Sequence, residues 1–235
     1  MRATVAALLF LFLAAMPAAS ALAHALVDVQ SDLTQREPAV VFEPGVGSPF
    51  PAFKLQDPDG DSVDLATLRG KVVVLDFIAT RSADGSAQSD LMAKIQGDVA
   101  AGHMADQVRL ISVALDSEHD TVGTRKAYGP AHGLKPDNWM YLAGTTDDEA
   151  QRLAARLGAA KLQTPPTGRA VLSGPVTYVI DSAGMLRARF FGLKFDPLNL
   201  VIYVNALTND HHENQTTGTP AGAAPSLWQT VKGLL

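Results

Sequence analysis

The stretch that decides the fold is GKVVVLDFIATRSADGSAQSDLMAKIQ, residues 70–96. Its first part, Lys71 to Ile78, is a nearly continuous apolar run rich in β-branched residues. Such a run is typical of a strand buried on both faces, as in a parallel sheet. The residues from Ser86 to about Ala101 have a helical period, with an apolar face formed by Leu91, Met92, Ile95 and Val99. The stretch therefore predicts a buried strand that leads through a short loop into an amphipathic helix.

The flanking sequence continues this alternation of strands and helices. Upstream we expect a hairpin of residues 53–55 and 62–64, then a short helix capped by Asp64 that stops at Gly70. Downstream we first expect a strand at 108–115, a helix at 121–132 that is capped by Asp120, and a strand at 139–143. A helix then runs from the capping box 146–149 to Leu157 and is followed by a loop at 161–172. The last expected elements are a hairpin of 176–180 and 185–191 and a helix at 197–207. The order predicts an α/β, thioredoxin-like fold, with a central mixed sheet flanked by helices and an N-terminal hairpin extension.

The two ends of the chain differ from this domain. Residues 1–23 contain Arg2, an apolar run and an Ala21-Leu22-Ala23 pattern, which is typical of a secretory signal peptide; an uncleaved membrane anchor is the alternative. Residues 24–46 are interpreted as a linker, and residues 47–207 as the thioredoxin-like domain. Residues 208–235 are interpreted as a flexible tail with a short terminal helix from about residue 226. We expect an exported, periplasmic protein that is soluble after cleavage or tethered by residues 1–23.

The composition excludes several classes of function. The chain has 235 residues, a net charge of -5, 47% hydrophobic and 18% charged residues, and no cysteine. These values are those of a globular protein, and a mildly acidic chain lacks the basic face that nucleic-acid binding needs. The absence of cysteine excludes thiol nucleophiles, disulfide exchange and thiolate metal sites.

Several blocks of the chain resemble the Sco/SenC family of thioredoxin-fold copper proteins. In residues 70–96, Thr80 and Asp84 match the family motif, while Ser82 and Ser86 stand where it has two cysteines. In LISVALDSEHDTVGTRKAYGPAHGL, residues 110–134, the matching residues are Ser112, Asp116, Asp120 and Thr121, and Ser117 replaces a proline. Residues 177–192, TYVIDSAGMLRARFFG, are similar to the last hairpin of the family. The resemblance spans about residues 50–207.

The resemblance also implies a third copper ligand, a histidine eight positions before the aspartate that ends a strand. Counting back from Asp181 gives Ser173, so this chain lacks that ligand as well. Pro175 stands where related thiol–disulfide thioredoxins have a cis-proline. Soft thiolates select Cu(I), and neutral serine hydroxyls do not replace them. We therefore expect no copper at the usual site and no resident cofactor.

The candidate residues also have simpler structural roles. Ser82 is expected to cap the following helix, and a catalytic serine would need a base such as His119. For Asp84, Asp116 and Asp120 we expect solvated loop, capping or turn roles. His24, which would be the N-terminal residue after cleavage, and the tail residues His211 and His212 are weak candidates for Cu(II) binding.

Three hypotheses follow. The first is a degenerate Sco/SenC-like protein, for which the resemblance implies a role in copper delivery or redox poise during cytochrome c oxidase assembly. Its partner would be an oxidase subunit or a relative with intact ligands. The second is an active-site Cys-to-Ser form of a competent copper chaperone or thiol–disulfide protein. The third, a thioredoxin-like or peroxiredoxin-like enzyme or a serine hydrolase, is disfavoured because there is no cysteine and no G-x-S-x-G motif; we expect no enzymatic activity.

Overall fold

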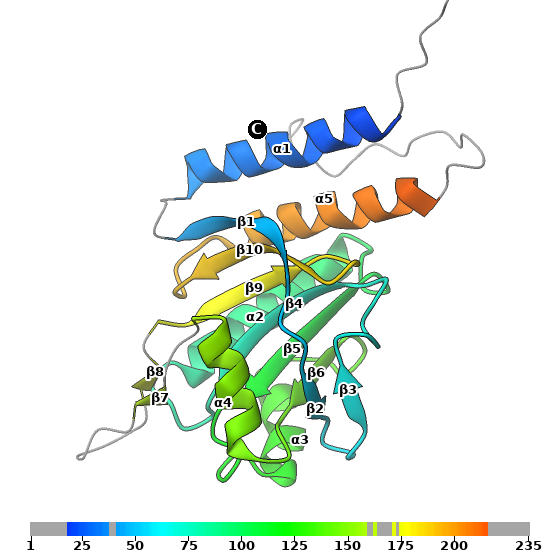
Figure 1. The fold of residues 1–235 in the computed structure, drawn as a ribbon. Coiled ribbons are helices and arrows are strands. Elements are labelled where there is room, and N and C mark those ends of the chain that lie inside the picture. The colour runs from blue at the N-terminus through cyan, green and yellow to red at the C-terminus, as the bar shows by residue number, and fades with distance from the viewer. Residues whose placement is uncertain (1–17, 38–40, 159–161, 164–170, 173, 216–235) are drawn as a thin grey trace, which may run out of the picture.

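The computed structural model describes residues 18–37, 41–158, 162–163, 171–172 and 174–215 (Figure 1). The helices are α1 (Ala18–Arg36), α2 (Gly85–Ala101), α3 (Val122–Ala131), α4 (Asp147–Arg156) and α5 (Pro197–Gln215). The strands are β1 (Phe42–Pro49), β2 (Lys54–Gln56), β3 (Ser62–Asp64), β4 (Val72–Ile78), β5 (Val108–Ala114), β6 (Trp139–Leu142), β7 (Leu162–Gln163), β8 (Val171–Leu172), β9 (Val176–Ile180) and β10 (Met185–Phe191).

A six-stranded mixed sheet forms the centre of the molecule, in the order β1-β10-β9-β4-β5-β6. The strands β4, β5 and β6 are parallel, whereas β9 runs antiparallel to both β4 and β10. All seven residues of β4 are buried, because both faces of this central strand are covered. The predicted α/β, thioredoxin-like fold is confirmed.

Alternate side chains of β4 enter two separate cores. Val72, Val74 and Ile78 pack with residues of α1, α2 and α5, whereas Val73, Leu75 and Phe77 pack with residues of α4 and of the β2–β3 hairpin. Figure 1 shows α4 in front of the sheet, α2 behind it, and α1 alongside α5. Since the period of a strand is two, one apolar run is able to supply both cores.

The predicted linker at residues 24–46 is wrong. Most of this segment forms α1 and the beginning of β1, and α1 packs antiparallel on α5. Gln30 Nε2 donates to the hydroxyl of Tyr203 at 2.8 Å, and Glu37 Oε1 accepts from the backbone N–H of Asp196 at 3.0 Å. Leu33 is fully buried in the core beneath α1. These contacts make the segment part of the domain.

The strand β1 shows why prolines misled the interpretation of this segment. It pairs antiparallel with β10, and the register shifts between Pro44 and Ser48. An edge strand has one unpaired side, so a proline at a bulge there removes no ladder hydrogen bond. The predicted hairpin, by contrast, is confirmed as β2 and β3, with its first strand one residue later than expected, at 54–56 in place of 53–55.

Three smaller differences concern element boundaries. Residues 65–70 form turns and not a short helix, although Asp64 Oδ1 does accept from the backbone N–H of Thr67 at 2.9 Å. The helix α5 extends to Gln215, so the described residues 208–215 are helical and not part of a flexible tail. Within the predicted loop 161–172, the described residues form the short pair β7 and β8. Among the described residues, no helix is long and apolar enough to span a membrane.

Candidate functional site

The candidate site lies at the carboxyl ends of β4 and β5, where two loops meet. These loops, residues 79–84 and 115–121, lead into α2 and α3. The backbone N–H of Leu115 donates to the carbonyl of Ile78 at 2.9 Å, which joins the loops where the parallel strands end. Ligands of open α/β sheets bind at this edge, because successive loops converge there.

Ser82 and Ser86, the two serines that the resemblance sets against the family's cysteines, have different environments. Ser82 is 2% exposed, and its hydroxyl has no hydrogen-bond partner among the described residues. Ser86 is exposed in the first turn of α2. A side chain at Gly85 would lie 2.7 Å from the carbonyl oxygen of Ala79 and 3.2 Å from Ser82 Oγ, so glycine allows the helix to begin close to the loop. The pair therefore consists of one buried and one solvated hydroxyl.

The predicted capping role of Ser82 is wrong. The N-cap of α2 is Asp84, and its side chain makes no capping hydrogen bond. Asp84 is half-buried beside the positive end of the helix, in the loop position that the sequence predicted. The hydroxyl of Ser82 is buried and makes no hydrogen bond to the first turn of α2.

Asp120 joins the two loops through its carboxylate. It accepts from the Thr80 hydroxyl, from the Thr80 backbone N–H at 3.3 Å, and from the Tyr141 hydroxyl at 3.1 Å. Burial raises the pKa of Asp120, and the bonds from Thr80 and Tyr141 oppose this increase. The prediction that Asp120 caps the helix is wrong, since Thr121 accepts from the Thr124 N–H at that end. Asp120 instead has a buried bridging role.

Asp116 forms a second connection between the loops, nearer the surface. Its carboxylate accepts from Arg81 Nη2 at 2.7 Å and Arg81 Nε at 3.2 Å, and its other oxygen lies 2.8 Å from His119 Nδ1. Burial alone would raise the pKa of Asp116, but the bonds from Arg81 and His119 outweigh it and lower the pKa. Both neighbours hold Asp116 as a carboxylate. Its backbone carbonyl accepts from the N–H groups of His119 and Asp120 at 3.0 and 2.7 Å, so the predicted turn role is confirmed and the contact with Arg81 is additional. Arg81 could not be predicted from the sequence, because no local pattern pairs residues 35 positions apart.

A buried acid beneath the site was also missed. Asp76 lies in β4 next to Ser112 of β5 and Thr177 of β9, and it is 3% exposed. Burial raises the pKa of Asp76 to about 7, although the Ser112 hydroxyl partly offsets the effect. One carboxylate oxygen has no partner among the described groups. Its position in the run VVVLDFI was the available sequence signal, since a charged residue in a strand buried on both faces is uncommon.

Arg125 connects the β2–β3 hairpin to this region. Its guanidinium donates to the carbonyl of Gln56 at 3.1 Å and to the carbonyl of Tyr141 at 3.4 Å. Burial lowers the pKa of Arg125, while the nearby Tyr141 and Asp120 oppose that change. Lys126 forms a more exposed ion pair with Asp59 of the hairpin at 2.6 Å. The hairpin extension is thus fixed to α3 beside the candidate site.

The remaining predicted positions do not converge on this site. Ser173 lies outside the described residues, and Pro175 is half-buried after a trans peptide bond, since the described residues contain no cis peptide; the expected cis-proline is therefore absent. His24 belongs to α1, and the pair His211–His212 belongs to α5; the structure does not describe their side chains. Within the described part, no group of three histidine, aspartate or glutamate side chains is suited to a metal ion.

Comparison with known proteins identifies the family. The sequence profile of the AhpC/TSA family matches residues 46–189, which is more than half of the chain. This chain belongs to the AhpC/TSA family. The chain is also 26% identical to the SCO1 protein homolog of Bacillus subtilis over 155 residues, 64% of this chain and 77% of the relative. The predicted resemblance to Sco/SenC proteins is confirmed.

Solved structures of similar proteins agree with this assignment of the fold. A SCO1/SenC family lipoprotein from Bacillus anthracis has a TM-score of 0.62 at 20% identity, covering 70% of this chain and 97% of its own. Copper-bound ScoI from Bradyrhizobium japonicum has a TM-score of 0.52 at 23% identity, covering 68% and 99%. Another similar structure, BsSco, is described as a member of the Sco family of cytochrome c oxidase assembly proteins, with a TM-score of 0.61 at 24% identity over 72% and 97%.

Proposed function

We propose that this AhpC/TSA-family chain is an exported, Sco-like protein that acts in cytochrome c oxidase assembly by binding a protein partner. It holds no copper at the Ser82–Ser86 motif and carries out no enzymatic turnover. The observation that carries the proposal is the pair of serines: one hydroxyl is buried without a partner and the other is exposed. Neutral hydroxyl oxygens do not select Cu(I), and a site without sulfur cannot cycle between dithiol and disulfide.

The partner is an oxidase subunit or a relative that has both cysteines and the histidine. The loops at this edge support a binding role, because two carboxylates hold them in one arrangement. Asp120 joins Thr80 to Tyr141, and Asp116 joins Arg81 to His119. A surface that is ordered before binding loses less conformational entropy when a partner docks. Export would place this surface in the periplasm, with residues 1–23 either removed or retained as a tether.

A copper titration tests the metal part of the proposal. The purified chain is titrated with Cu(I) in the presence of a competing chelator, alongside the Ser82→Cys/Ser86→Cys double variant. We expect the natural chain to leave the copper on the chelator, and the dithiol variant to retain a part of it. One equivalent of Cu(I) that is held by the natural chain and released by Ser82→Ala would contradict the proposal. A parallel Cu(II) titration tests His24, His211 and His212.

A deletion strain tests the assembly part. Loss of this chain in a cell that keeps an intact Sco-type relative should lower the amount of assembled, copper-loaded oxidase. Restoration by the natural chain, but not by a form without residues 1–23, would support the need for export. Normal oxidase levels in the deletion strain under copper limitation would argue against a role in assembly.

A further inference from the structure

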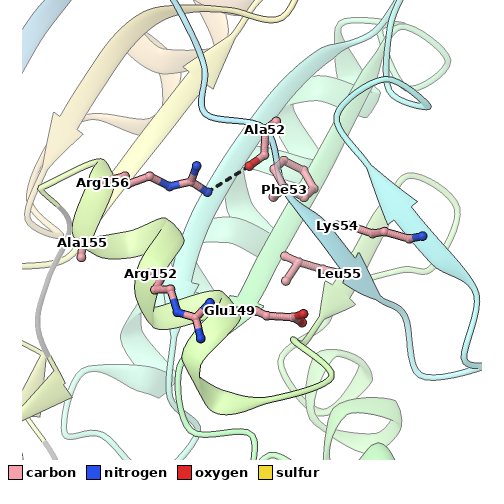
Figure 2. Close-up of a pocket in the computed structure, with 8 residues that line it drawn as sticks. All are labelled: Ala52, Phe53, Lys54, Leu55, Glu149, Arg152, Ala155 and Arg156. Carbon is pink, nitrogen blue, oxygen red and sulfur yellow. Dashed lines mark hydrogen bonds between the residues drawn. The ribbon is translucent and has the colours of Figure 1, made fainter.

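A pocket of about 580 Å³ lies between the segment that enters β2 and the outer face of α4 (Figure 2). Residues 52–55 form one wall, and Glu149, Arg152, Ala155 and Arg156 form the other. Its volume is within the range of ligand pockets in proteins. None of its lining residues belongs to the two loops of the candidate site, so it is a separate feature of the surface.

The helix α4 presents two different faces. Ala150, Leu153 and Ala154 are buried in the core against the sheet. Arg152 and Arg156 lie on the opposite side, one helical turn apart, along the pocket. The buried face of α4 therefore consists of small and aliphatic residues, and its charged residues line the pocket.

The charges of the pocket favour an anionic ligand. Arg156 Nη2 donates to the carbonyl of Ala52 at 3.0 Å, which uses one of the five N–H donors of its guanidinium. Within the described part of the chain, neither Arg156 nor Lys54 has a carboxylate within 4.0 Å. The carboxylate of Glu149 is already bonded to the Thr145 N–H and hydroxyl at 2.8 and 3.0 Å. An arginine in this state is well suited to bind a carboxylate through two N–H groups.

On the edge of β2 that faces away from β3, Lys54 has unpaired backbone groups among the described residues. Gln56 exchanges both of its backbone hydrogen bonds with Ala143, at 2.8 and 2.9 Å, and therefore directs them away from β3. Because backbone groups alternate along a strand, Lys54 directs its N–H and C=O to the same edge. The structure gives neither group a hydrogen-bond partner among the described residues. An unpaired strand edge is a template for an added strand.

We propose that this pocket binds an extended, acidic segment of a protein partner. The segment adds as a short strand to the Lys54 edge of β2, and one of its carboxylates lies against Arg156. This inference rests on the proposed partner-binding function and specifies the chemistry of the partner. The open edge recognises the extended backbone, and the guanidinium of Arg156 selects an acidic side chain.

A peptide titration tests this proposal. The probe is the amidated, acetylated peptide Thr-Glu-Val-Glu-Val-Glu, added to the isotopically labelled full chain and followed by nuclear magnetic resonance. We expect shifts at the Lys54 amide and slower hydrogen exchange of its N–H, as strand addition requires. Arg156→Glu should weaken binding by at least about tenfold, as expected for removal of a close charge pair. Arg156→Lys, which keeps the charge but loses the planar fork, should have an intermediate effect.

Lys94→Glu is the matched control, because Lys94 is exposed on α2 and its substitution changes the net charge equally. Equal loss of binding in Arg156→Glu and Lys94→Glu would overturn the proposal by indicating non-specific attraction. Lys54 resonances that stay unchanged at saturating peptide would also overturn the proposal. Chemical shifts of the pocket residues that change with protein concentration in the absence of peptide would overturn it as well, because they would indicate that a second copy of this chain occupies the pocket. If the peptide does not bind but deletion of the chain still lowers the amount of assembled oxidase, the pocket proposal is rejected and the proposed function is retained.

Discussion

Substitution of the buried acid Asp76 by asparagine should change how the stability of the protein depends on pH. Asp76 is 3% exposed in the central strand, and burial raises its pKa from 3.8 to about 7. Asparagine has nearly the same shape and keeps the polar contacts with the Ser112 hydroxyl possible. The substitution therefore removes the titration while leaving the packing of β4 largely intact.

The sign follows from proton binding in the two states. Between about pH 4 and about pH 7 the unfolded chain has lost the proton of Asp76 while the native protein keeps it, so the free energy of unfolding falls as the pH rises. Each pKa unit is worth about 1.4 kcal/mol, and the difference between 3.8 and about 7 therefore corresponds to about 4 kcal/mol. This contribution is fully present below about pH 4 and is lost above about pH 7.

The measurement is urea unfolding of the natural chain and of Asp76→Asn at a series of pH values from about 4 to about 8. The two proteins should have similar stability at the acid end, and the variant should be about 3–4 kcal/mol more stable at the alkaline end. Asp61→Asn is the matched control, because Asp61 is exposed in the hairpin turn. A constant difference between Asp76→Asn and the natural chain at every pH would refute the reasoning, since it would mean that Asp76 is ionised in the native protein throughout.

Two further substitutions test other parts of the structure. Ser82→Ala removes a buried hydroxyl without a partner among the described residues and should raise the free energy of unfolding by about 1–2 kcal/mol. The control Ser86→Ala, at an exposed position, should change it by less than about 0.5 kcal/mol. Destabilisation by Ser82→Ala in thermal unfolding would mean that the hydroxyl has a partner. Leu33→Ala should lower the free energy of unfolding by about 2–5 kcal/mol, because Leu33 is 1% exposed on the inner face of α1. Val27→Ala, at a residue of the same helix that is 60% exposed, should be nearly neutral. Equal small effects of the two substitutions in chemical denaturation would show that α1 does not belong to the domain.

The elements of the domain could be read from the sequence wherever burial has a regular period. The run at 71–78, the helix after it and the hairpin at 176–191 were all predicted, because two-residue and helical periods record which faces are buried. The helix α1 was missed because its first residues overlap a signal-like apolar run, and its buried positions depend on α5, more than 160 residues away. The positions of Ser82 and Ser86 followed from the motif, but their opposite environments did not.

The sequence by itself determined the class of fold, the motif positions and the absence of thiol chemistry, because each depends on residue identity and local spacing. Only the tertiary structure decided that Asp116 pairs with Arg81, that Asp120 bridges Thr80 and Tyr141, and that Lys54 lies at an open strand edge. Those features depend on which strands become neighbours and on how far each side chain is removed from water. The order of strands in the sheet sets both, and it brings together residues whose separation in the chain carries no periodic signal.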